Sequence, residues 1–183
     1  MSRIKNKKIL KKIIPEIPFV PYSIYELVSS VKNQFFSNIN HNVSISFFEQ
    51  KTLACIEYNS TSAIIKMHSI LNHKGTPKEV ILFIIKHELL HLLIPPREIK
   101  KRLVYHPPEF FEHGRSIFPE YSLIWNWLYF HFPFCLIVHK RKEQTIVTRE
   151  WKDIMYDKRL GFKEIMDIIT PKEASKALEM SFI

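Results

Sequence analysis

The sequence predicts an α+β fold in which a small, mostly antiparallel sheet packs on one long apolar helix. Three short runs rich in β-branched and aromatic residues, at 44–48, 53–58 and 62–68, predict strands, and Asn59-Ser60-Thr61 predicts a hairpin turn between the last two. The apolar stretch that follows, at 77–94, is too long for a strand and predicts a buried helix. Further helical patterns downstream predict a helical C-terminal extension.

Each main element has its own local signal. Apolar residues at helical spacing from Ile24 to Phe35 predict an amphipathic helix that ends near Phe36. In the apolar helix, Thr76 is the expected N-cap, Pro77 the first helical residue and Glu79 the partner in a capping box. Pro95-Pro96 ends that helix, since proline cannot continue the backbone hydrogen bonds.

The apolar helix carries the sequence His87-Glu88-Leu89-Leu90-His91, an H-E-x-x-H motif. Residues four apart lie on one face of a helix, so the two imidazoles can point at one ion. Glu88 can then act as the general base that takes a proton from the attacking water. The alternative is a pair of core histidines that form hydrogen bonds with backbone groups. In that case Glu88 would be buried without a partner, which costs folding free energy.

A catalytic zinc needs a third protein ligand, and the leading candidate is His106. It precedes Pro107-Pro108, a pair that suits the start of a new helix, so its ring can project back toward the apolar helix. Glu109, Glu112 and His113 are the alternative ligands.

The stretch from Ser62 to about Leu128 resembles the SprT-like metallopeptidase domain, the zincin-like class that includes the DNA–protein crosslink protease Spartan. The resemblance lies in a strand at 63–68, the H-E-x-x-H helix, a long insert, and His106-Pro107-Pro108-Glu109-Phe110, with the helix at 22–36 as the family's opening helix. It implies Zn²⁺ held by His87, His91 and His106, catalysis by Glu88, and proteins, DNA-associated ones included, as substrates. Pro107 replaces the family's glycine, and the four-cysteine zinc ribbon of many members is absent from this sequence. Small single-domain zincins are the other relatives, and they would favour a glutamate as third ligand.

Basic residues are unevenly distributed in a chain with a net charge of +9. They gather in the first twelve residues (Arg3, Lys5, Lys7, Lys8, Lys11, Lys12), between the second and third ligands (Arg97, Lys100, Lys101, Arg102), and in a predicted hairpin turn (Lys140, Arg141, Lys142). Such clusters near an active site fit attraction to phosphate backbones, and they fit anionic peptides or a merely solvated surface as well.

The remaining patterns predict a soluble protein in a reducing compartment. Cys55 and Cys135 lie in apolar, strand-like runs and are expected to be free thiols. No secretory signal is evident, and the uncharged segment 121–138 is better divided into a helix and a strand than drawn as a membrane span. We therefore expect a cytoplasmic protein, or a nucleoid or nuclear one if it associates with DNA.

The predicted organisation is a basic arm at 1–20, a metallopeptidase domain at 21–132, and an extension at 133–183 packed on that domain. The extension comprises a hairpin of 136–139 with 145–148 and helices at 150–157, 162–169 and 172–180. The predicted function is zinc-dependent peptide hydrolysis, with an extended substrate added to Ser62–His68 as the exposed edge strand. The alternatives are a non-catalytic metal module that binds nucleic acid, and a zinc hydrolase of non-peptide bonds.

Overall fold

The computed structural model describes residues 18–50, 52–132, 136–137, 145–146 and 159–168, and it confirms the α+β class. In the part described, the helices are α1 (Ile24–Phe35), η1 (a 3₁₀ turn, Ser69–Leu71), α2 (Lys78–Leu93), α3 (Pro108–Ile117), α4 (Tyr121–His131) and α5 (Phe162–Ile168). The strands are β1 (Asn42–Phe48), β2 (Ala54–Tyr58), β3 (Ser62–His68), β4 (Arg97–Ile99), β5 (Arg102–Val104), β6 (Leu136–Ile137) and β7 (Thr145–Ile146).

The three-stranded sheet has the order β1-β3-β2, which corrects two predictions. It is mixed, because β1 runs parallel to β3 while β2 runs antiparallel to it. Ser62–His68 (β3) is the central strand and not the edge, because both β1 and β2 pair with it. β1 does not pair with β2, although β2 follows it in the sequence. The edge strands of this sheet are therefore β1 and β2.

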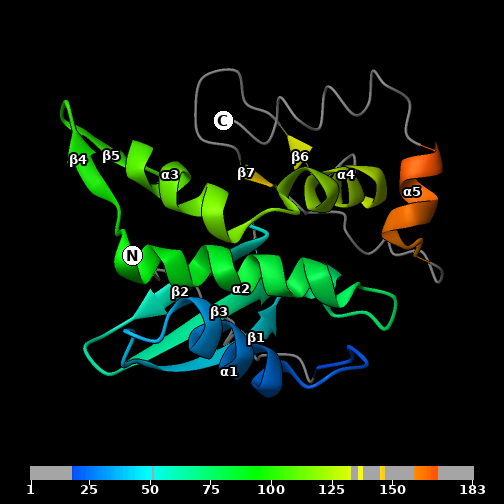
Figure 1. Ribbon diagram of the computed structural model, residues 1–183, viewed down its shortest axis with the longest axis horizontal. Coiled ribbons are helices and arrows are strands. Elements are labelled where there is room, and N and C mark those ends of the chain that lie inside the picture. The colour runs from blue at the N-terminus through cyan, green and yellow to red at the C-terminus, as the bar shows by residue number, and fades with distance from the viewer. Residues whose placement is uncertain (1–17, 51, 133–135, 138–144, 147–158, 169–183) are drawn as a thin grey trace, which may run out of the picture.

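The sheet buries one face against the helices. Ala63, Ile65 and Met67 alternate along β3 and are almost fully buried, as period-two alternation requires for a core-facing strand side. α1 contacts β1, and α2 contacts both α1 and β2. α2 crosses the middle of the molecule, with the sheet on one side and α3 and α4 on the other (Figure 1). This position between two layers explains why its sequence is apolar almost all the way round.

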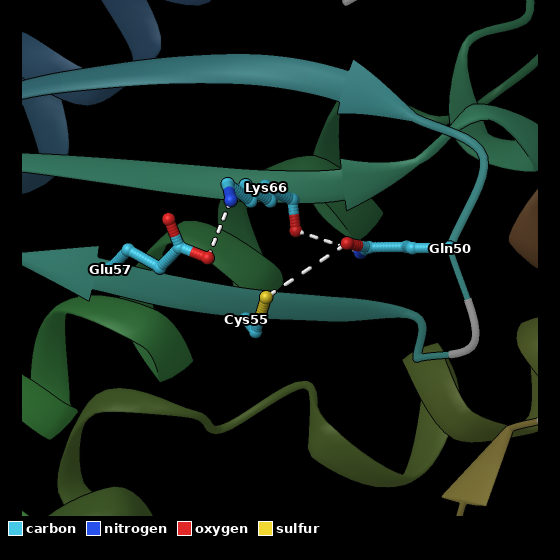
Figure 2. Close-up of polar contacts among 4 residues, drawn as sticks. All are labelled: Gln50, Cys55, Glu57 and Lys66. Atoms are coloured by element: carbon cyan, nitrogen blue, oxygen red, sulfur yellow. Dashed lines mark hydrogen bonds and ion pairs between the residues drawn. The ribbon is translucent and has the colours of Figure 1, made fainter. Parts of the chain in front are cut away.

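The opposite face of the sheet is partly polar (Figure 2). The ammonium of Lys66 lies 2.5 Å from Glu57, and the side-chain amide of Gln50 donates to the Lys66 carbonyl at 3.0 Å. Cys55 is a free, partly buried thiol, as predicted. Its Sγ donates to Gln50 Oε1 at 3.9 Å. Burial raises the pKa of this thiol, and the charges of Glu88 and Glu57 raise it further. Cys135 lies outside the described residues.

The start of α2 differs from its prediction. The first helical residue is Lys78, Pro77 takes the N-cap position, and no side chain caps the helix. The hydroxyl of Thr76 instead accepts a hydrogen bond from Arg159, 83 residues further along the chain. The Thr76 hydroxyl, which the sequence predicts as the N-cap of this helix, thus accepts from a buried guanidinium instead.

The C-terminal part is described only in pieces. β6 and β7 pair antiparallel, as the predicted hairpin requires, and α5 matches the helix expected at 162–169. The arm at 1–17, the turn at 140–142 and the helices expected at 150–157 and 172–180 lie outside the described residues. In the described chain, no helix combines the length and the apolar character needed to span a membrane.

Candidate metal centre

Two of the three predicted ligands lie on the C-terminal half of α2. His87 and His91 are one helical turn apart, and their ring centroids are 5.2 Å from each other. His91 is 9% exposed, because the helix is covered on both sides. The helix therefore holds the two imidazoles side by side, with His91 buried and His87 half-buried.

The third predicted ligand joins them from the next segment of the chain. His106 lies just before α3, and its Nε2 atom is 3.0 Å from Nε2 of His87. One candidate ligand atom from each of the three histidines lies within 4.8 Å of the others. The structure thus brings together His87, His91 and His106, 19 residues apart at the widest, in one cluster.

Phe110, on the first turn of α3, packs against all three rings. Its centroid lies 5.0 Å from His87, 4.6 Å from His91 and 4.7 Å from His106, and it is 2% exposed. Such close aromatic packing restricts the orientation of each imidazole. The sequence contained this residue in the motif that follows His106, but its contact with all three ligands is evident only in three dimensions.

Burial keeps the three histidines neutral. The pKa of His87 lies well below its ordinary value because of burial first, and then because of the neighbouring His106 and His91. Burial, with a smaller effect of His106, lowers the pKa of His91 to about 4, and burial also lowers that of His106. Neutral imidazoles offer the lone pairs that a metal ion needs, so the cluster is ready to bind one at neutral pH.

Glu88 is buried on the same helix and is 5% exposed. Burial raises the pKa of its carboxyl group to about 8. No hydrogen bond or ion pair joins it to another residue in the described portion of the chain. A carboxyl group in this state is costly to the fold and suited to proton transfer near neutral pH.

The alternative ligands lie elsewhere. Glu109 forms an ion pair with Arg97, with Nη1 and Oε1 2.5 Å apart and Nη2 and Oε2 2.9 Å apart. Glu112 and His113 are exposed on α3. Among the described residues, the cluster of metal-binding type contains none of these three side chains.

The donor set fits a transition-metal ion. A tetrahedral Zn²⁺ with bonds of about 2.0–2.1 Å separates its nitrogen ligands by about 3.3 Å, close to the spacing of His87 and His106. Nδ1 of His91 is buried and has no hydrogen-bond partner in the described structure, so no such bond competes for that nitrogen. Three neutral imidazoles suit zinc and its neighbours, and they do not suit Mg²⁺ or Ca²⁺, which prefer oxygen.

Comparisons of the chain with protein-family models, with curated proteins and with solved structures found no match. The resemblance to SprT-like domains therefore rests on the residues of the site alone. What the structure establishes is a cluster of three histidines that can hold a metal ion.

Proposed function

We propose that this chain is a zinc-dependent metallopeptidase whose metal ligands are His87, His91 and His106 and whose general base is Glu88. The observation that carries the proposal is the buried Glu88, which forms no hydrogen bond or ion pair with another described residue and directly follows His87, one of three converging histidines. A metal site that serves only structure has no use for such a carboxylate. The same reasoning disfavours the non-catalytic metal module.

The chemistry divides between the ion and the chain. Bound Zn²⁺ would supply Lewis acidity, which polarises the scissile carbonyl and lowers the pKa of the attacking water. Glu88 accepts a proton from that water as its oxygen bonds to the carbonyl carbon. Glu88 then delivers the proton to the amide nitrogen as the carbon–nitrogen bond breaks. Phe110 keeps the ligand rings in place and excludes bulk water from their inner side.

The edge strand β2 is the proposed dock for the substrate backbone. Among the described strands, β2 pairs with β3 alone, and it contacts α2. An extended polypeptide can add to such an edge by main-chain hydrogen bonds, which recognise peptides without demanding one sequence. This support is specific to a peptide substrate and favours it over a non-peptide bond.

Replacement of Glu88 by Gln tests the proposal. The variant should keep one equivalent of zinc and lose about 10²–10⁴-fold in kcat on an unfolded protein substrate, because an amide cannot accept the proton. Elemental analysis and a cleavage assay measure the two quantities. Glu112→Gln is the matched control and should keep most of the activity, since Glu112 is exposed on α3 and lies outside the histidine cluster.

Two results would count against this assignment. The absence of stoichiometric metal from wild-type protein purified without chelator would remove the three-histidine site. Alternatively, Glu88→Gln could keep more than about a tenth of the wild-type rate, which would assign the base to another residue.

Binding of nucleic acid by the basic clusters of the chain is a separate proposal. The arm at 1–12 that would supply much of the attraction lies outside the described residues. The second predicted cluster, at 97–102, lies on β4, β5 and the turn between them.

A further inference from the structure

The segment between the second and third ligands forms the β4–β5 hairpin, which projects beyond the end of α2 and beside α3 (Figure 1). Ile99 pairs with Arg102, so the turn consists of Lys100 and Lys101 alone. Both lysines adopt left-handed backbone angles, with φ of 50° and 60°. A two-residue turn of this kind normally takes Asn-Gly, because a Cβ atom is strained there. The hairpin thus carries two lysines at its tip, although their left-handed backbone conformation is strained.

The cations at the tip form no ion pair within the described structure, and exposed Glu98 on β4 is the one acidic residue of the hairpin. Arg97, at the base of the hairpin, forms its ion pair with Glu109 and ties the hairpin to α3. Lys100, Lys101 and Arg102 are exposed, and none forms an ion pair with another described residue. The ion pair at the base therefore holds a cationic tip near the start of α3, which follows His106 in the chain.

The same segment exposes large apolar side chains. Leu93, Leu103 and Tyr105 are 40%, 54% and 46% exposed, and they are half of the six large hydrophobic residues exposed in the described structure. Leu93 lies two residues after His91, and Tyr105 directly precedes His106. Exposed apolar residues therefore flank His91 and His106 in sequence, before and after the cationic tip, and Leu103 and Arg102 lie on opposite faces of the hairpin.

We propose that this cationic and apolar rim (Leu93, Lys100–Leu103 and Tyr105) selects polypeptide substrates that carry acidic residues beside apolar ones near the cleaved bond. The inference rests on the proposed peptidase function and names its substrate class. Acidic side chains complement the tip, and apolar side chains cover Leu93, Leu103 and Tyr105. A phosphate backbone would satisfy the cations but would leave the two leucines exposed, so a polypeptide fits the whole rim better.

The test compares two peptides that share one apolar core and differ only in flanking Glu or Gln residues. The wild-type zinc enzyme should prefer the acidic peptide by about three- to tenfold in kcat/KM, and added salt should reduce the preference. Lys100→Asn with Lys101→Gly removes both charges in a turn that suits the new residues, so the fold is retained. This variant should bring the ratio of acidic to neutral peptide close to one.

Lys74→Gln with Lys78→Gln is the matched control. Both lysines are exposed, and Lys78 begins α2, about 14 Å from His87 along the helix. This pair changes the net charge by the same amount and should keep the wild-type ratio. An equal fall in both double variants would mean that net charge alone attracts the substrate, and it would overturn the proposal.

Two further measurements separate the possible failures. Peptide binding to zinc-loaded Glu88→Gln needs no turnover, so an acidic preference there that depends on the tip would support the rim even if no peptide were cleaved. An unchanged peptide ratio in the tip variant, together with lost binding of a single-stranded oligonucleotide, would make the hairpin a nucleic-acid surface and overturn the proposal.

Discussion

At the scale of single residues, the buried carboxyl group of Glu88 opposes the stability of the fold that contains it. Its carboxyl group is buried, and its pKa is raised to about 8 by burial alone. The folded, metal-free protein therefore holds a proton that the unfolded chain releases between pH 4.5 and about 8. It follows that this carboxyl group lowers the free energy of unfolding progressively as pH rises through that range.

We expect Glu88→Gln to be more stable than the wild type when both are metal-free. The gain should be on the order of 3 kcal/mol at pH 7 and should vanish near pH 4, where the carboxyl group is protonated in both states. Urea denaturation at several pH values measures it, with exposed Glu98→Gln as a control that should change little. Equal stabilities from pH 4 to pH 8 would show that Glu88 is not buried as an unpaired acid.

At the scale of elements, one buried lysine joins three helices. Lys86 on α2 is 8% exposed, and its ammonium lies 3.1 Å from Glu120 at the start of α4 and 4.6 Å from the ring centre of Phe35 on α1. It directly precedes His87, so this contact fixes α2 against α4 and α1 next to the histidine cluster. A buried charge of this kind depends on its partner.

Glu120→Gln should lower the free energy of unfolding by about 1–3 kcal/mol, because it leaves the ammonium of Lys86 buried without an opposite charge. Addition of Lys86→Met should recover part of that loss, since the double variant buries no charge at this point. Urea denaturation of the four proteins in a double-mutant cycle measures the coupling. Additive effects of the two substitutions would contradict the proposed pairing.

At the scale of the whole molecule, Arg159 connects the C-terminal segment to the loop before the metal helix. It is 9% exposed, donates to Thr76 Oγ1 and to the Ile70 carbonyl, and lies over the rings of Trp127 and Phe132. Next to it, the Leu160 carbonyl accepts from the indole of Trp127 at 2.8 Å. These contacts join α4, the segment before α5 and the N-terminal end of α2.

Arg159→Met should cost about 2–4 kcal/mol of unfolding free energy, because it leaves two buried acceptors without donors. Arg159→Lys keeps the charge but not the two-pronged donor geometry, so its loss should be intermediate. Zinc affinity should change little in either variant, since the ligands lie at the other end of α2. A loss below about 0.5 kcal/mol for Arg159→Met would show that this contact does not hold the segment.

Much of the candidate site follows from local sequence. H-E-x-x-H on an apolar helix places His87, Glu88 and His91 together because helical spacing depends only on residues near one another. The bounds of β3 match its predicted range, since alternation and the flanking turn are also local signals. Pro107-Pro108 indicated the start of α3, and with it the place of His106.

Tertiary structure decided what distant residues do together. β1 pairs with β3 rather than with β2, and this pairing turned the expected edge strand into the central one. Arg159 donates a hydrogen bond to the Thr76 hydroxyl, and Phe110 packs against the rings of three histidines. The β4–β5 hairpin escaped prediction because its strands are three residues long and its turn lacks Asn and Gly. Local patterns determine which elements form, whereas strand order and long-range partners depend on how the elements bury their surfaces against one another.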